Sequence, residues 1–148
     1  MRLNIFVLSA FATLLHASAI PRDVSSANAS ITEWAGPLYD CRGSIMCSTL
    51  HVKACDVAVN TQIIRDDELN YGSASSRRPH LGACHGLGAD FGCAILVEGN
   101  PKCVRSGNDL WWDYQEIRKN GCHHCGHKYW GKGCKTTIDY EPECRRIW

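Results

Sequence analysis

Ten cysteines in a chain of 148 residues constrain this sequence more than any other feature. They follow an N-terminus with the pattern of a secretory signal: Met1-Arg2 precedes an apolar run over residues 5–15, and Ala17-Ser18-Ala19 forms a cleavage site of small side chains. An even number of cysteines in a small secreted chain forms a disulfide framework. We therefore predict a secreted, extracellular protein whose disulfides use Cys41, Cys47, Cys55, Cys84, Cys93, Cys103, Cys122, Cys125, Cys134 and Cys144.

The chain divides into three expected parts. Residues 1–19 are the signal peptide, and no other apolar run is long enough to cross a membrane, so no membrane insertion is expected. Residues 20–37 hold few large apolar side chains and no cysteine, which indicates a flexible leader. This leader contains the sequon Asn28-Ala29-Ser30, which makes Asn28 a candidate glycosylation site. The stapled part, residues 38–148, has the size of one domain, which we expect to be a monomer.

Hydrophobic periodicity and capping signals predict two helices. The first is expected to run from Ser48 or Thr49 toward Asp66. The second is the clearer of the two, because the stretch 106–109 fits a capping box and Asn120-Gly121 fits a left-handed C-cap.

Two strands are expected, over residues 91–97 and 136–140, while the Gly-, Ser- and His-rich stretch 69–90 is expected to be loop, with a tight turn over 82–88. A chain of this length lacks room for the crossovers of a parallel sheet. The predicted fold class is therefore α+β: a small disulfide-stapled α/β sandwich, in which two helices pack on one face of an antiparallel sheet.

The net charge of the chain indicates which classes of partner it can bind. The chain has 16 Lys and Arg residues against 15 Asp and Glu residues, and the signal peptide removes Arg2, so the remainder is neutral. A neutral chain is not expected to bind nucleic acid as its main partner.

The segment Cys122-His123-His124-Cys125 has the spacing of a zinc half-site or of a redox motif. A second cysteine pair with that spacing is missing, and the secretory context favours structural disulfides, so we expect no metal and no cofactor. A nucleophile pair such as Cys84 with His85 is disfavoured, because sequence neighbours rarely form such pairs. Together these patterns predict that the protein is not an enzyme.

The cluster Arg77-Arg78-Pro79-His80 concentrates positive charge in an expected loop. Two interpretations compete: a solvated surface, and part of a protein-binding face, because binding residues concentrate on loops held by rigid scaffolds. On the second helix, Trp111 and Trp112 point about 100° apart, so one of them is expected to be exposed.

Two cysteine motifs resemble those of the type 4 killer toxin family of smut fungi. Cys41-Arg42-Gly43-Ser44-Ile45-Met46-Cys47 is similar to its CRGS-x-x-C opening, and Gly121-Cys122-His123-His124-Cys125-Gly126 is similar to its GC-x-x-CG segment. Thr136-Thr137-Ile138-Asp139-Tyr140 resembles its last strand, and Cys144 its terminal cysteine.

The resemblance implies an antiparallel sheet with two helices on one side and disulfides tying Cys41 and Cys47 to the 122–125 segment. It also implies a secreted toxin that inhibits the growth of target cells without catalysis, with a membrane protein of the target cell, a calcium channel, as partner. The family's important basic residue lies just before the cysteine matched to Cys84, which makes Arg77, Arg78 and His80 the candidate binding residues. The alternative from another class is a secreted effector or adhesive module that binds a host protein or a cell-wall glycan.

Overall fold

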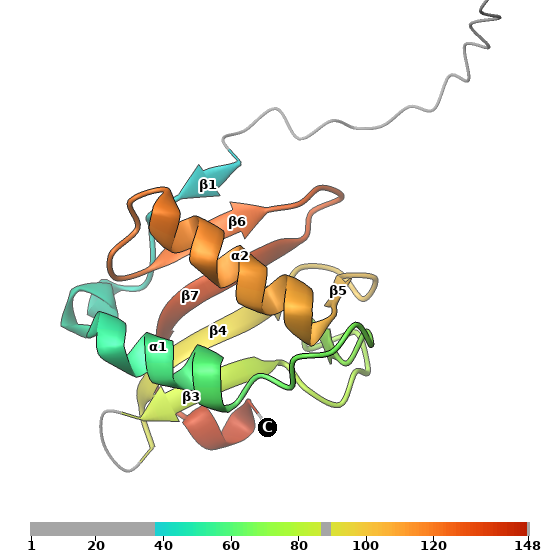
Figure 1. Cartoon of the computed structure of the whole chain (residues 1–148), viewed down its shortest axis with the longest axis horizontal. Helices are drawn as coiled ribbons and strands as arrows, with labels where there is room; N and C mark the ends of the chain where they lie inside the picture. The colour runs from blue at the N-terminus through green and yellow to red at the C-terminus, as the bar shows by residue number, and fades with distance from the viewer. Residues whose placement is uncertain (1–37, 87–89, 148) are drawn as a thin grey trace, which may run out of the picture. The chain divides into compact units, whose positions relative to one another are not determined.

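A five-stranded antiparallel sheet carries two α-helices on one of its faces in the computed structural model (Figure 1). The structure describes residues 38–86 and 90–147. The expected signal peptide, leader and Asn28 therefore lie outside the described residues. The strand order is β1-β6-β7-β4-β3, and β2 pairs with β5 in a separate two-stranded sheet. The elements are β1 (Tyr39–Asp40), η1 (Ile45–Thr49), α1 (Val52–Thr61), β2 (Tyr71–Gly72), β3 (Gly82–Gly86), β4 (Gly92–Glu98), β5 (Val104–Arg105), α2 (Gly107–Lys119), β6 (Gly126–Tyr129), β7 (Lys135–Glu141) and η2 (Cys144–Arg146).

The core lies between the helices and the sheet and confirms the expected fold class. Helix α1 contacts β3 and β4, and α2 contacts β6 and β7. Alternate residues of β4 face the helices, as a strand's two-residue period requires, and the same layer contains buried side chains from both helices. Over the residues that the structure describes, neither helix is long and apolar enough to span a bilayer. The buried set includes Ala54, Cys55, Ala58, Val59, Cys93, Ile95, Val97, Leu110, Tyr114, Ile117 and Ile138.

Helix α2 follows the sequence-based expectation closely. The Ser106 hydroxyl accepts a hydrogen bond from the Asp109 backbone N–H at 3.0 Å, which is the expected N-cap. At the other end Gly121 has φ of 90°, a conformation that glycine adopts without a steric cost. Burial and a hydrogen bond to Asp56 on α1 raise the pKa of Tyr114 to about 12, so this tyrosine joins the two helices as a neutral donor.

Helix α1 differs from the expectation at both ends. The residues Ser48 and Thr49 lie in the 3-10 helix η1, and α1 begins only at Val52, with His51 as an N-cap that makes no side-chain cap bond. The helix ends at Thr61 rather than near Asp66. The residues that were interpreted as a helix start therefore lie in a short 3-10 turn that contains Cys47.

The stretch 69–90 is not only loop, because it contains β2 and the edge strand β3. The tight turn expected over 82–88 is wrong: residues 82–86 pair in register with β4. A Cβ atom at Gly82 would overlap the Ile95 carbonyl, and one at Gly92 would overlap the His85 carbonyl. The glycines that suggested a turn are therefore places where two strands approach too closely for a side chain.

All ten cysteines form disulfides, as predicted. Two bonds join the segment around η1 to the α2–β6 connection. Of the other three, one joins α1 to β4, one joins β3 to η2, and one joins the residue before β5 to the residue before β7. Bonds that close loops of this length restrict the unfolded chain strongly. The pairs are Cys41–Cys122, Cys47–Cys125, Cys55–Cys93, Cys84–Cys144 and Cys103–Cys134.

A buried carboxylate pins α2 to the sheet. Asp113 is 2% exposed and accepts hydrogen bonds from Lys128 Nζ at 2.6 Å and from Thr136 Oγ1 at 2.5 Å. The Arg105 Nε atom lies 3.1 Å from the same carboxylate, and the Arg105 guanidinium stacks on the Trp130 ring at 4.1 Å. Two cations therefore compensate the charge of Asp113, and one hydroxyl donates a further hydrogen bond to it.

Candidate functional site

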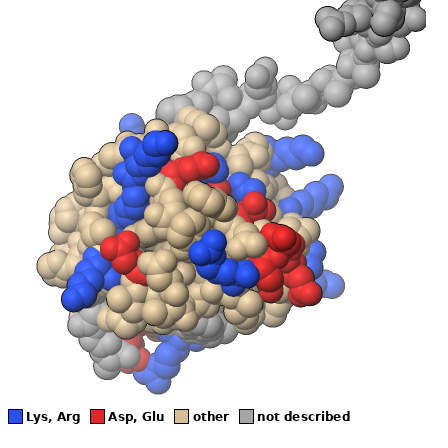
Figure 2. All heavy atoms as spheres, in the orientation of Figure 1, with Lys and Arg blue, Asp and Glu red and all other residues tan. Residues whose placement is uncertain are grey.

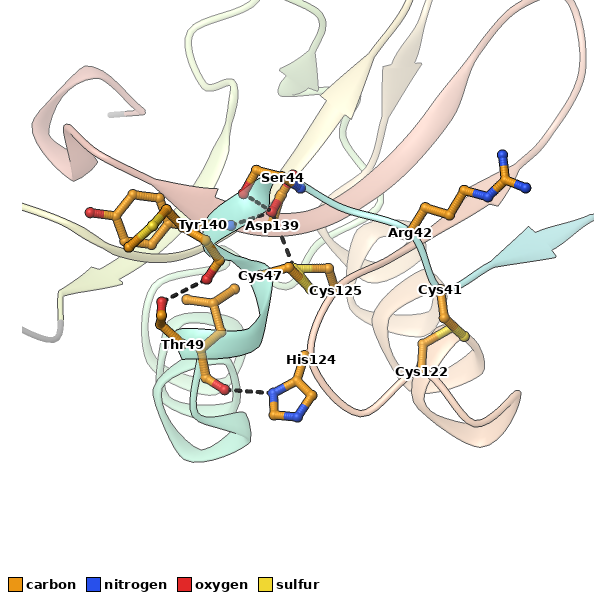
Figure 3. The surroundings of a disulfide bond; sticks show 12 residues. Cys41, Arg42, Ser44, Cys47, Thr49, Cys122, His124, Cys125, Asp139 and Tyr140 are labelled. Carbon is orange, nitrogen blue, oxygen red and sulfur yellow. Dashed lines mark hydrogen bonds between the residues drawn. A yellow bond between two sulfur atoms is a disulfide. The ribbon is translucent and has the colours of Figure 1, made fainter.

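The segment 41–48, which we name the clasp loop, is fixed at both ends by disulfides (Figure 3). Cys41 is bonded to Cys122 and Cys47 to Cys125, so both cysteines of the CxxC motif are structural staples, as expected. The Arg118 guanidinium at the end of α2 donates to the carbonyls of Cys122 and His124, at 2.8 and 3.0 Å, and so fixes the segment that faces the loop.

Asp139 holds the middle of the clasp loop against the sheet. Its carboxylate accepts hydrogen bonds from the Ser44 backbone N–H at 2.7 Å and from the Ser44 hydroxyl at 2.8 Å (Figure 3). A Cβ atom at Gly43 would overlap Cys125, so only glycine allows the loop to lie this close to the second disulfide. The Gly-Ser pair of the motif therefore has a structural role.

The residues that follow the clasp loop are also anchored. His124 Nδ1 lies 2.8 Å from the Leu50 carbonyl, and because a carbonyl only accepts, Nδ1 is the donor (Figure 3). Thr49 Oγ1 donates to the Met46 carbonyl at 2.6 Å within η1. Disulfides and hydrogen bonds thus leave the loop backbone little freedom.

This rigid backbone presents apolar side chains to solvent. Ile45 is 98% exposed and Met46 is 44% exposed. Beside them lies a hollow of about 490 Å³ whose lining includes Ser48, His123 and His124 and contains no carboxylate. The cysteines here are all disulfide-bonded, so no thiolate is available for nucleophilic chemistry or metal binding. The arrangement suits a binding surface: a fixed apolar projection with two histidine side chains beside it.

The predicted binding residues Arg77, Arg78 and His80 belong to one loop but do not form one exposed cluster. The two arginines are exposed, and Arg77 has a positive φ of 60°. His80 is half-buried: its ring packs on Tyr71 with 5.5 Å between centroids, and its carbonyl accepts from the Gly72 N–H at 3.0 Å. The backbone bridge between Tyr71 and His80 turns this histidine inward.

The tryptophan pair of α2 behaves as expected. Trp112 is 56% exposed, whereas Trp111 is half-buried against Asn60 and Arg65.

A row of polar side chains crosses the helix-free face of the sheet. His127 Nδ1 lies 2.9 Å from Thr137 Oγ1, and His127 Nε2 lies 3.9 Å from Asp40 Oδ1. Thr137 donates its proton to Glu98 at 2.5 Å, and Lys135 Nζ lies 3.0 Å from the same carboxylate. This line of Asp, His and Thr does not activate a nucleophile, because the Thr137 proton points to Glu98 and Thr137 is only 3% exposed.

The pKa shifts in this row follow from burial and hydrogen bonding. Burial and the nearby Lys135 charge lower the pKa of His127, outweighing the Asp40 carboxylate. Burial raises the pKa of Asp40, but hydrogen bonds from Tyr129 and the Arg42 backbone outweigh it, so the net pKa is lowered. Burial likewise raises the pKa of Glu98, and the bonds from Thr137 and Lys135 bring it below its usual value. At neutral pH His127 is therefore neutral and both carboxylates are charged.

Sequence reasoning missed Ile45 and Asp139 as parts of the site. The signal for Ile45 was the apolar pair 45–46 among the five residues between Cys41 and Cys47, a segment too short to bury both side chains. No local signal identifies Asp139, because its partner Ser44 lies 95 residues away.

Comparison with known proteins assigns the family. A model of the meiotically up-regulated gene family (MU117) matches residues 39–144, well over half of the chain. No curated protein matches at a significant level. The identification with the type 4 killer toxin family is therefore wrong. The residues that carried that resemblance, such as Gly43, Cys122 and Cys125, build the clasp, and a disulfide arrangement of this kind does not specify a family. The chain belongs to the meiotically up-regulated gene family.

Proposed function

We propose that this chain is a secreted protein that acts by binding, without catalytic turnover, and that its clasp loop inserts Ile45 into an apolar pocket of a protein on a cell surface. The observation that carries the proposal is the 98% exposure of Ile45 on a backbone fixed by two disulfides. Burial of an isoleucine side chain stabilises a complex by about 1.5–3 kcal/mol.

Rigidity supports this function because binding normally costs conformational entropy. A loop already held in one conformation loses little freedom when it docks, so more of the burial energy appears as affinity. The disulfides, the Ser44–Asp139 bonds and the His124–Leu50 bond supply that order before any partner arrives.

The charge around the loop favours a neutral or acidic partner surface. Arg42 is exposed on the clasp loop and points away from the Cys47–Cys125 bond (Figure 3). His123 and His124 border the hollow, which no carboxylate lines. Basic groups at a rim guide encounter with a partner of opposite charge, while the buried apolar contact supplies most of the affinity.

Growth inhibition and calcium-channel block stay predictions. They came with a family resemblance that the family match replaces, and no feature of the clasp selects a channel over another surface protein. The family's description refers to up-regulation in meiosis, so meiotic cells belong in the test beside vegetative ones.

The experiment measures binding of the labelled protein to intact cells, vegetative and meiotic, by flow cytometry. The replacement Ile45→Ser should weaken binding about 10- to 150-fold, the equivalent of about 1.5–3 kcal/mol. The matched control Leu69→Ser removes another exposed apolar side chain, 45% exposed, and should bind like wild type. Protease treatment of the cells should abolish the part of the binding that depends on Ile45. Equal binding of wild type and Ile45→Ser, or an Ile45-dependent part that survives protease treatment, would reject the proposal.

A further inference from the structure

The outer face of α2 carries an exposed indole ring in a fixed position. Trp112 is 56% exposed and meets Trp111 edge to face, with 4.8 Å between ring centroids and 83° between ring planes. Trp111 is itself held, because its Nε1 donates to Asn60 at 3.1 Å and the Arg65 guanidinium covers its ring at 4.1 Å. The fold therefore buttresses a tryptophan that it leaves open to solvent.

Planar polar side chains share this face with Trp112. Residues three and four positions apart are neighbours on a helix, which places Asn108, Asp109, Gln115 and Glu116 around the ring. The outermost of these are fixed: Asn108 Nδ2 donates to Asp67 at 2.8 Å, and Glu116 binds Lys128 at 2.6 Å. From Asn108 to Glu116 the row extends along about 12 Å of helix, at ~1.5 Å per residue.

The acidic side chains on the outer face of α2 disfavour binding of polyanions. A compact group of acidic side chains lies over the N-terminal end of α2, whereas basic side chains are scattered over the rest of the helix-bearing face (Figure 2). Arg65, the cation nearest the ring pair, is already stacked on Trp111. A sulfated or uronic-acid polymer would meet carboxylates beside the ring, whereas an uncharged ligand would meet hydrogen-bonding partners.

We propose that this face is a platform for a neutral glycan, in which one pyranose ring stacks on Trp112. The C–H groups on the flat side of a pyranose are apolar and pack on an aromatic face, while the hydroxyls point outward in the ring plane. Amide and carboxylate groups such as those of Asn108, Asp109 and Gln115 can both bond to adjacent hydroxyls. The linear row suits an extended chain of sugars.

This platform is independent of the clasp loop, since it rests on α2 and on a different ligand class. Absence of glycan binding would leave the Ile45 proposal standing, and loss of the Ile45 effect would leave the platform standing. If both hold, the protein links a polysaccharide to a surface protein.

The test measures cosedimentation of the purified protein with insoluble β-1,3-glucan, chitin and cellulose, and titration calorimetry with the corresponding hexasaccharides. We expect at least one of these neutral glycans to bind, and Trp112→Ala to weaken that binding at least tenfold. Trp112→Phe should retain part of it, and Gln115→Ala should weaken it to a smaller extent. The control Phe91→Ala, at an aromatic residue that is 40% exposed and packs on Tyr140 instead, should bind as wild type does.

Thermal unfolding of each variant separates binding from folding, and Trp112→Ala is expected to unfold at the wild-type temperature because the ring is largely exposed. The proposal is overturned by binding to none of the neutral glycans, by equal binding of wild type and Trp112→Ala, or by a preference for heparin over every neutral glycan. Trp112-dependent capture of a protein without any glycan binding would also overturn it.

Discussion

Replacement of Asp113 tests whether the buried ion network stabilises the packing of α2 on the sheet. The Asp113→Ala change removes the carboxylate that lies within 3.1 Å of both Arg105 and Lys128. The side chains of these two cations are only 18% and 16% exposed, so water replaces the lost partner poorly. Removing one member of a buried pair costs about 3–5 kcal/mol. Arg105 and Lys128 would keep only exposed partners, Asp109 at 3.9 Å and Glu116 at 2.6 Å.

The measurement is thermal unfolding at pH 7 without reductant, followed by circular dichroism. At about 4 °C per kcal/mol for a domain near 100 residues, the expected fall in Tm is about 12–20 °C. The control Glu116→Gln removes a carboxylate that also binds Lys128 at 2.6 Å but is 42% exposed, and it should cost less than about 1 kcal/mol. Equal effects of the two replacements, or an Asp113→Ala protein within about 1 kcal/mol of wild type, would show that the buried ion network does not stabilise the packing of α2.

Three further predictions concern the sheet, the clasp and the basic loop. The pKa of His127 is lowered below its usual 6.5. The neutral histidine therefore contributes to stability above that pH, and this contribution is lost as the pH falls through the folded-state pKa. His127→Gln should flatten the pH dependence of Tm between pH 7 and 5, and an unchanged slope would contradict this. Gly43→Ala should destabilise the protein by at least about 2 kcal/mol in guanidinium unfolding, because the added methyl group overlaps Cys125, and a wild-type midpoint would contradict the clasp geometry. The double change Arg77→Gln and Arg78→Gln should leave Tm within about 2 °C of wild type, because both side chains are exposed; a larger shift would show that this loop has a structural role.

Local patterns were sufficient for α2, β4 and β7. The Ser106 cap, the 3–4 spacing of Leu110, Tyr114 and Ile117, and Gly121 all lie within one stretch of chain, so the helix could be predicted from its own residues. The oxidised state of the cysteines also followed from the secretory pattern and their even number.

Structure that depends on distant partners could not be predicted in the same way. The edge strand β3 contains Gly82 and Gly86, and only its pairing with β4 explains why glycine is required at position 82. The hydrogen bonds between Ser44 and Asp139 cross 95 residues, so neither residue signals the other. His80 was expected on an exposed surface, and its contact with Tyr71 becomes visible only in three dimensions.

The family assignment also shows the difference between short local motifs and features that extend over the whole domain. The motifs at 41–47 and 121–126 resemble those of another family, and each motif covers only a few residues around the Cys41–Cys122 and Cys47–Cys125 bonds. The family match covers residues 39–144 and so includes the sheet and both helices. Motif resemblance therefore predicted the fold and the bonds of Cys41 and Cys47 to the 122–125 segment, but it named the wrong family.

Site-directed photo-crosslinking tests the role of the clasp loop most directly. The purified protein would carry benzoylphenylalanine in place of Ile45, which is 98% exposed and tolerates a larger ring, and a second preparation would carry it in place of Leu69. After irradiation on intact cells, we expect a discrete protein adduct from position 45 and none from position 69. The absence of any adduct from position 45, or the same adduct from both positions, would contradict the claim that the clasp loop docks into a surface protein.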